Sequence, residues 1–212
     1  MASANRILFW GSGSAPAWRV QVLLKEKKLD FTSKQVEFSK NGHKSEEIIK
    51  LNPRGQVPTF KDGETVVNES IAALLYLEKA YPKPSFLPEK TAPEVLQRTL
   101  ESNNLQLQLV KVLTTKEDDP AYSEVVTKLK TEFGYWEQYL SKSKFLAGDE
   151  LTLADIAAGP FFLVYERQGA TFKDYPKVAA YIANLKQIPS FKETFPPHWA
   201  DTPSPNKLKD RL

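Results

Sequence analysis

Two serines stand immediately before a stretch with helical periodicity near the start of the chain. Ser12 and Ser14 follow a strand-like run at 6–10 and precede a helix expected to begin at Pro16 or Ala17. A hydroxyl at a helix N-terminus can donate a hydrogen bond to an anionic ligand, and the helix dipole lowers the pKa of a thiol held nearby. The alternative is that either serine only caps the helix. Because no His or Asp is nearby, neither serine is expected to act as a nucleophile.

A second candidate lies where a strand ends and a helix begins, at Glu69 and Ser70. The free N–H groups and the dipole of a helix N-terminus attract a carboxylate, and the hydroxyl of Ser70 adds a donor. The carboxylate of Glu69 can pair with an ammonium group, so the two residues together suit an amino-acid zwitterion. A plain N-cap at Ser70 is the simpler alternative.

A third candidate is Pro58, which enters a strand directly after Val57. Proline cannot donate a hydrogen bond to a sheet, so it is expected on an edge strand unless the chain turns sharply. A cis Val57–Pro58 bond makes that turn and leaves the N–H and C=O of Val57 facing an extended peptide ligand. A plain edge-strand proline is the alternative.

The elements that position these residues alternate between strand and helix periodicity over residues 1–82. Asp62-Gly63 divides two short strands and is a strong hairpin signal. The predicted order is β-α-β-α-β-β-α, an α/β domain that opens with a parallel βαβ unit. The residues expected on one face of its last helix are Ile71, Leu74 and Leu75.

A proline-rich linker over 83–91 separates this domain from the rest of the chain. Residues 92–212 read as helices, so the predicted fold class is α/β followed by an all-α domain. Thr152 and Asp155 have the spacing of a capping box at the start of one of these helices. Pro160 is expected to bend or locally break the same helix.

Composition excludes several classes of function. The 29 Lys and Arg against 26 Asp and Glu give a net charge of +3, and no basic stripe interleaves with aromatics, so no nucleic-acid partner is expected. The absence of cysteine excludes disulfides, thiolate metal sites and thiol–disulfide chemistry by the protein itself. With two histidines, and His198 expected on the surface, no metal site is expected. No membrane span or signal peptide is visible, so a cytoplasmic location is expected.

Taken together, these motifs resemble the cytosolic glutathione transferases over nearly the whole chain. The stretches that carry the resemblance, in the order and spacing of that family, are GSGSAPAWRV, NGHKSEE, NPRGQVPTF, VVNESIAALLYLEKAYP and FLAGDELTLADIAAG. The first loop and the C-terminal PPHWADTPSPNKLKDRL look most like the rho class. The resemblance implies a thioredoxin-like N-terminal domain, an all-helical C-terminal domain and a homodimer. It also implies glutathione as a co-substrate, with no further cofactor.

The resemblance assigns a role to each candidate residue. Ser14 matches the serine that hydrogen-bonds the glutathione sulfur, and Val57 before Pro58 matches the residue whose backbone pairs with the cysteinyl part. Glu69 and Ser70 match the pair that holds the γ-glutamyl end. The residues expected near the glycyl carboxylate are His43, Lys44 and Gln56. The residues expected at the electrophile site are Ser12, Trp18, Ser102 and Gln106.

The expected activity is conjugation of the glutathione thiolate to small hydrophobic electrophiles, a detoxification reaction. Pro16 stands where the zeta class has a cysteine, which argues against zeta-type isomerisation, and the lack of cysteine excludes a dehydroascorbate reductase. The loop is one residue longer than in the theta and delta patterns, which leaves Ser12 as a weaker rival to Ser14. A non-catalytic ligand carrier or structural protein on the same fold is the alternative, and the retained serine and γ-glutamyl pair argue against it.

Overall fold

The structure is a computed structural model that describes residues 5–212, and it divides into two compact units. The first unit consists of residues 5–85 together with 190–201. The second unit consists of residues 86–189 together with 202–212.

The chain returns to the first unit near its C-terminal end. Residues 190–201 group with that unit, whereas the sequence predicts a single helical domain over 92–212. The division between residues 85 and 86 falls inside the linker predicted at 83–91. As domain bounds, 1–82 and 92–212 stay predictions, and the returning segment is a feature that helical periodicity alone does not reveal.

Within the described residues, four strands form one sheet in the order β2-β1-β3-β4. Their bounds are β1 Arg6–Gly11, β2 Thr32–Val36, β3 Thr59–Asp62 and β4 Thr65–Val67. β1 pairs in parallel with β2 and antiparallel with β3, and β3 pairs antiparallel with β4. The predicted βαβ unit and hairpin are confirmed. Gly63 in the hairpin turn has φ +58, a left-handed conformation that a residue without Cβ adopts readily.

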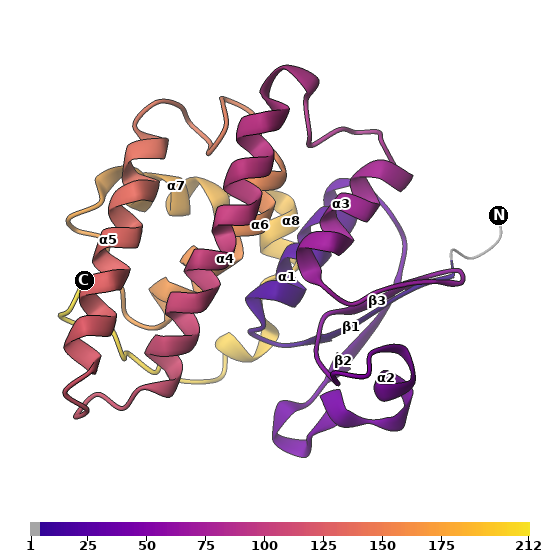
Figure 1. Ribbon diagram of the computed structural model, residues 1–212, viewed down its shortest axis with the longest axis horizontal. Coiled ribbons are helices and arrows are strands. Elements are labelled where there is room, and N and C mark those ends of the chain that lie inside the picture. The colour runs from indigo at the N-terminus through magenta and orange to yellow at the C-terminus, as the bar shows by residue number, and fades with distance from the viewer. Residues whose placement is uncertain (1–4) are drawn as a thin grey trace. The chain divides into compact units, whose positions relative to one another are not determined.

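Helices accompany this sheet in the order that the sequence predicts. Their bounds are α1 Ala15–Glu26, η1 Phe38–Lys40, η2 Gly42–Lys44, α2 Glu46–Leu51 and α3 Ser70–Ala80, with α8 Pro189–Glu193 and η4 Pro197–Trp199 at the returning segment. α1 and α3 pack against each other, and the strands run between them and α2 (Figure 1). On α3, Leu74 is buried as predicted, but Ile71 and Leu75 are partly exposed. Ala73 and Leu77 complete the buried face in their place.

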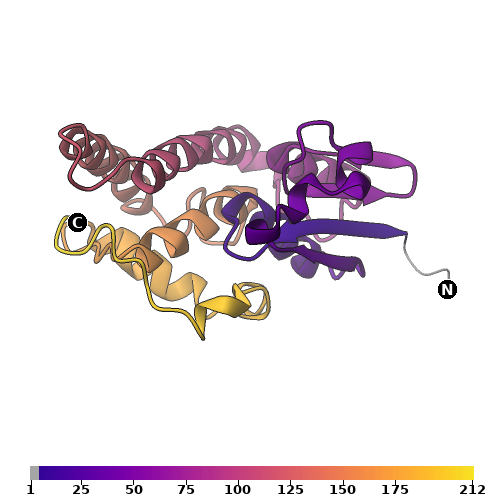
Figure 2. The ribbon, with the colours of Figure 1, turned by 90° about the horizontal axis from the view of Figure 1, so that it is seen from below.

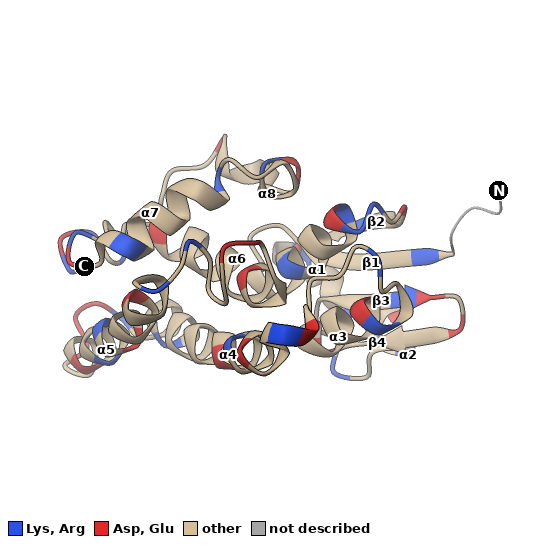
Figure 3. Cartoon of the chain, turned by 90° about the horizontal axis from the view of Figure 1, so that it is seen from above, with Lys and Arg blue, Asp and Glu red and all other residues tan. Residues whose placement is uncertain are grey.

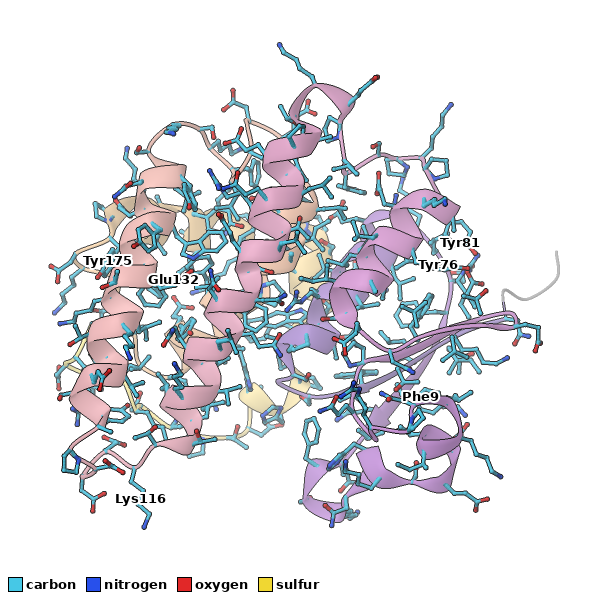
Figure 4. The ribbon with its side chains drawn as sticks, in the orientation of Figure 1. Phe9, Tyr76, Tyr81, Lys116, Glu132 and Tyr175 are labelled. Carbon is cyan, nitrogen blue, oxygen red and sulfur yellow. The ribbon has the colours of Figure 1, made fainter. Side chains whose placement is uncertain are left out.

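Polar contacts hold α3 to the hairpin turn. The hydroxyls of Tyr76 and Tyr81 donate to the carboxylate of Asp62, at 3.2 Å and 2.5 Å (Figure 4). The guanidinium of Arg6 lies 3.8 Å from the same carboxylate. These contacts occupy one end of the sheet, where β1 begins and β3 ends, so the opposite end is left for other residues.

The second unit is helical. Its elements are η3 Glu89–Thr91, α4 Ala92–Thr114, α5 Tyr122–Leu140, α6 Leu153–Arg167 and α7 Pro176–Leu185. α4 packs on α6 and lies beside α5, as Figures 1 and 2 show. The core contains aromatic side chains from α5 and α6, with the rings of Phe133 and Tyr165 5.0 Å apart and edge to face. The hydroxyl of Tyr165 donates to the backbone of Leu105 at 2.6 Å, which ties α6 to α4.

The start of α6 carries the predicted capping box between Thr152 and Asp155, which is confirmed. Pro160 does not break α6, which runs as one helix from Leu153 to Arg167 with Pro160 inside it, and the alternative of a bend stays a prediction. Every residue from Leu153 to Tyr165 is buried. Packing on all sides therefore holds the helix together across a residue that donates no backbone hydrogen bond.

Charges of both signs are interspersed along the surface helices, as Figure 3 shows for α4 and α5. This distribution agrees with the small net charge of +3. Within residues 5–212, no helix is both long and apolar enough to cross a bilayer.

Candidate active site

The strand register gathers the predicted site residues at one end of the sheet. β1 and β3 run antiparallel with Phe9 opposite Thr59, so the end of β1 is level with Val57. The hairpin brings the chain back to the same end, where Glu69 follows β4. β2 also ends there, because it runs parallel to β1. The serine loop, Val57, Glu69 and the η1–η2 segment therefore all leave the sheet on one side.

The serine loop is a tight turn that opens α1. The N–H of Ser14 donates to the carbonyl of Gly11 at 3.0 Å, and Gly13 has φ +83, which only glycine adopts without strain. Ser14 is the N-cap of α1, and its Oγ accepts from the N–H of Ala17 at 3.4 Å. The hydroxyl hydrogen of Ser14 is therefore not used in this cap, and the side chain is half-buried. This arrangement allows Ser14 to cap the helix and still donate to a ligand.

Ser12 has a partner that the sequence analysis missed. Its Oγ lies 2.5 Å from Nδ1 of His198, which is 186 residues away in the chain. His198 is exposed, as predicted, but the expectation of no histidine near the serines is wrong. The returning segment 190–201 brings the imidazole to the turn, and a contact of this sequence separation leaves no local pattern by which to find it.

Trp18 lies in the interior of the first unit. It is 2% exposed, and its indole N–H donates to the hydroxyl of Thr194 at 2.8 Å. Its ring meets those of Phe195 and Trp199 edge to face, at 5.7 Å and 5.6 Å. Trp18 thus anchors the returning segment to α1. Its predicted place at the electrophile site stays a prediction, which this burial does not favour.

The Val57–Pro58 peptide bond is cis, so the plain edge-strand alternative does not hold. β3 begins only at Thr59, which leaves Val57 outside the strand. The loop before it is braced by Asn52, whose side-chain amide donates to the carbonyl of Gln56 at 3.0 Å and to Oγ1 of Thr59 at 3.2 Å. Pro58 is buried beneath this loop, while Val57 is half-buried. The backbone of Val57 is thus carried on a braced segment.

Glu69 and Ser70 stand at an open helix start. Glu69 is the N-cap of α3 and is exposed, whereas Ser70 is the first helical residue and is 8% exposed. Ser70 is therefore not the N-cap, and within the described residues no side chain caps this turn. The first N–H groups of α3 are consequently oriented toward a position where an anion would be stabilised.

Arg19 places a buried charge in α1 near Glu69, the N-cap of α3. Arg19 of α1 is 0% exposed, and this burial lowers the pKa of its guanidinium to about 9, while the nearby charge of Glu69 acts in the opposite direction. Arg19 is not among the site residues that the sequence predicts. The only available signal was its position just after the serine loop, since a buried arginine is not evident from hydrophobic periodicity.

His43, Lys44 and Gln56 lie around one glycine. A Cβ on Gly55, which has φ +55, would meet Cδ of Lys44 at 2.7 Å and the carbonyl of His43 at 3.2 Å. The ammonium of Lys44 donates to the carbonyl of Arg54 at 2.9 Å. Nδ1 of His43 is buried and has no hydrogen-bond partner within the described residues. The structure therefore brings the predicted glycyl-carboxylate residues together around the turn before Val57.

The two predicted site residues of the second unit lie on α4. Ser102 is fully buried, and its hydroxyl donates to the carbonyl of Thr99 at 2.6 Å. Gln106 is half-buried one turn further along. The hydroxyl of Ser102 is thus used within its own helix, so its assignment to the electrophile site stays a prediction. Among residues 5–212, no group of three or more His, Asp or Glu side chains is placed to hold a metal ion.

The fold and the site together define a protein with a thioredoxin-like domain joined to a helical domain. The family model for the glutathione S-transferase N-terminal domain matches residues 5–79, and the model for the C-terminal domain matches residues 77–189. Glutathione S-transferase A of Pleuronectes platessa is 38% identical over 96% of this chain and 97% of its own length.

Solved structures agree with this match. A glutathione S-transferase of the Antarctic clam Laternula elliptica has a TM-score of 0.93 and 40% identity, covering 99% of this chain and 100% of that chain. A delta-class glutathione transferase of Nilaparvata lugens has a TM-score of 0.83 and 29% identity, covering 90% and 92%. The chain belongs to the glutathione S-transferase family. It is a glutathione transferase enzyme, and these relatives lend no support to the alternative of a non-catalytic protein.

Proposed function

We propose that glutathione binds at the end of the sheet where the serine loop, Val57 and Glu69 converge, and that Ser14 activates its sulfur. The observation that carries this proposal is the open start of α1, where Ser14 caps the helix with its oxygen and keeps its hydrogen for a ligand. Donation from this hydroxyl stabilises a thiolate, and the dipole of α1 adds to the effect. The protein contributes proximity and electrostatic stabilisation, and it forms no covalent intermediate.

The open start of α3 takes the γ-glutamyl end of glutathione. Its α-carboxylate accepts from the N–H groups of the first turn and from the hydroxyl of Ser70, while its ammonium pairs with Glu69. The exposed position of Glu69 and the location of Ser70 at the first turn support these roles. The buried charge of Arg19 supports the placement of Glu69 by favouring a carboxylate beside it.

The remaining contacts are with the cysteinyl and glycyl parts of glutathione. The backbone of Val57, next to Pro58, pairs with the cysteinyl part, supported by its position outside β3. His43, Lys44 and Gln56 face the glycyl carboxylate, supported by their grouping around Gly55. The positive charge of Lys44 contributes the electrostatic part of this contact, although it is already bonded to the carbonyl of Arg54.

The second substrate is a small hydrophobic electrophile, and the physiological role is detoxification. Ser12 and Gln106 are the better supported of the four candidates for its site, because both are half-buried. Trp18 and Ser102 are buried, so they contribute by shaping neighbouring residues. Glutathione is a co-substrate in this scheme, with no further cofactor, and the enzyme acts in the cytoplasm.

The enzyme works as a homodimer. α4 exposes a row of large apolar residues that a partner subunit would cover, namely Leu100, Leu107, Val110 and Leu113. Such a row is costly to leave in water, and two-fold symmetry is the commonest way to bury it. Sedimentation should therefore give a dimer at micromolar concentration, and a monomer under these conditions would contradict the assembly.

The role of Ser14 is tested by separating binding from turnover. Ser14→Ala should lower kcat/KM toward a chromogenic electrophile at neutral pH by as much as about 100-fold, by analogy with the loss of one oxyanion donor. The dissociation constant of glutathione should change little, since other residues carry the peptide contacts. Wild-type kcat/KM in the variant would overturn the assignment. A panel of electrophiles with the wild-type enzyme would define the second substrate.

A further inference from the structure

The returning segment places a histidine on the turn that carries both serines. Phe195 and Trp199 pack their rings against Trp18 of α1, and the intervening η4 carries His198. Nδ1 of His198 lies 2.5 Å from Oγ of Ser12, within hydrogen-bonding distance. This geometry is held from both sides, by the aromatic contacts and by the turn.

Gly13 makes the close approach possible. A Cβ at this position would lie 3.2 Å from Cε1 of His198 and 3.6 Å from Nε1 of Trp199, so a larger residue would press on the imidazole. Gly13 also needs its φ of +83 to form the turn. The same glycine therefore shapes the turn and admits the histidine.

The two serines are prepared for opposite roles. Ser14 accepts a backbone N–H from Ala17, which leaves its hydroxyl hydrogen for a ligand. Ser12 faces Nδ1 of His198, and when this nitrogen is unprotonated it accepts the hydroxyl hydrogen of Ser12. The oxygen of Ser12 then has a lone pair that can accept a proton from a ligand at the turn. A hydroxyl paired with a neutral imidazole is an arrangement that accepts a proton.

We infer that Ser12 and His198 take up the thiol proton of glutathione, a step that rests on the proposed location of the sulfur beside Ser14. The S–H bond breaks and its proton passes to Oγ of Ser12, while the original Ser12 proton passes to Nδ1 of His198. The products are a thiolate, which accepts from Ser14, and an imidazolium. The imidazolium keeps the proton while the thiolate is bound beside it, and because His198 is exposed it returns the proton to water once conjugation has consumed the thiolate.

The elements around this imidazole carry charges of both signs. The charged side chains carried by the elements packed around it are Arg19, Lys25 and Glu26 of α1, Lys192 and Glu193 of α8, and Asp201 after η4. Lys25 and Glu193 pair with each other at 3.2 Å, so their charges largely offset. Imidazole is the side chain most often used for proton transfer in general acid–base catalysis.

The first test follows the proton directly. The chain contains two histidines, so a protein labelled with ¹⁵N-histidine gives a simple spectrum, and His198→Asn identifies the His198 signals. At neutral pH, glutathione should convert His198 toward the imidazolium form, whereas S-methylglutathione, which has no thiol proton, should not. Identical His198 signals with the two ligands would overturn the proton route.

The second test uses turnover. His198→Asn keeps a hydrogen-bonding group at the position of Nδ1 but cannot be protonated near pH 7, so kcat/KM should fall about 100-fold, the lower end for general bases. The acid limb of its pH profile should disappear, while the affinity for glutathione stays within twofold. Glu124→Gln, a change of one exposed carboxylate on α5, should retain the wild-type pH profile.

The outcomes separate this inference from the proposed site. A wild-type profile in His198→Asn, together with a loss of activity in Ser14→Ala, would remove the proton route and leave the role of Ser14 intact. Full activity in both variants would remove both assignments. A fall in activity of Ser12→Ala that matches His198→Asn, with no further loss when the two are combined, is expected because the pair acts as one unit.

Discussion

The N-termini of two helices in this protein use their polar side chains in opposite ways. At the start of α6, Thr152 and Asp155 are 2% and 0% exposed, and the carboxylate accepts from groups of the protein itself. At the start of α1, Ser14 is half-buried and accepts one long contact of 3.4 Å from Ala17. The first start is closed and serves the fold, whereas the second is open and can serve a ligand.

The closed start is saturated with hydrogen bonds. Oδ2 of Asp155 accepts from the N–H and the hydroxyl of Thr152, both at 2.9 Å. Oδ1 accepts from the N–H of Leu146 at 2.9 Å and from the hydroxyl of Tyr181 at 3.2 Å. A capping motif is therefore recognised as structural when the chain itself supplies its partners, and sequence spacing alone does not make this distinction.

The largest expected effect is a loss of folding stability when the carboxylate at the N-terminus of α6 is removed. Asp155→Ala should lower the free energy of unfolding by about 4 kcal/mol, because it leaves buried donors of Leu146, Thr152 and Tyr181 unpaired. Ser14→Ala should cost only about 0.5–1 kcal/mol, the value of a weak cap. Denaturant unfolding of both variants measures the difference. Equal losses would contradict the distinction between the two starts.

The next largest effect is the dependence of the free energy of unfolding on pH, through the titration of Asp155. Burial raises the pKa of Asp155 to about 6, from an ordinary value of about 3.9. The folded state therefore holds this proton more tightly, so the stabilisation is complete below about pH 4 and is lost as the pH rises to 6, by about 3 kcal/mol.

The matched comparison is with Asp155→Asn, which does not titrate. The stability of the wild type relative to this variant should fall between pH 4 and pH 6 and stay constant above pH 6. Unfolding by denaturant across this range measures it. A relative stability that rises over the same interval would mean that the hydrogen bonds to the carboxylate outweigh its burial.

Removing the polar side chains at the N-terminus of α3 should weaken glutathione binding without lowering the stability of the fold. Glu69→Ala and Ser70→Ala should each weaken glutathione binding by about 1.5–3 kcal/mol, the value of a hydrogen bond to a charged group. Isothermal titration calorimetry measures the affinity, and thermal unfolding serves as the control for folding. Unchanged affinity in both variants would remove the γ-glutamyl assignment.

The smallest expected effect on glutathione binding comes from the exposed Lys44. Lys44→Ala should weaken glutathione binding by about 0.5–1 kcal/mol, because an exposed charge is screened by water and salt. Adding salt should reduce the wild-type affinity toward that of the variant. A loss larger than that of Glu69→Ala would show that the glycyl carboxylate, rather than the γ-glutamyl end, dominates recognition.

Local chemistry made much of the fold predictable. The Asp62-Gly63 turn, the alternating strands and the capping box at Thr152 each depend on residues close in sequence, and the structure confirms all three. The face of α3 was predicted less well, since Ile71 is partly exposed while Ala73 is buried. Small residues that pack against a neighbouring helix are not marked by hydrophobicity.

Long-range contacts were not predictable in the same way. His198 reaches Ser12 only because residues 190–201 return to the first unit, and no periodic pattern records that return. Arg19 is buried, and no pattern in the sequence predicts the burial of this charged residue. The roles of Ser14 and Glu69 were proposed through family resemblance, because each motif alone is equally consistent with a simple helix cap.

The most direct test of the open start of α1 is the pKa of the thiol of bound glutathione, measured from the ultraviolet absorbance of the thiolate as a function of pH. If Ser14 donates to the sulfur, this pKa should lie below that of a free thiol, about 8.5, in the wild type, and Ser14→Ala should raise it by about one unit or more. Asp155→Asn, a change at the closed start, should leave it unaltered. The same thiol pKa in the wild type and in Ser14→Ala would show that the hydroxyl of Ser14 does not stabilise the thiolate.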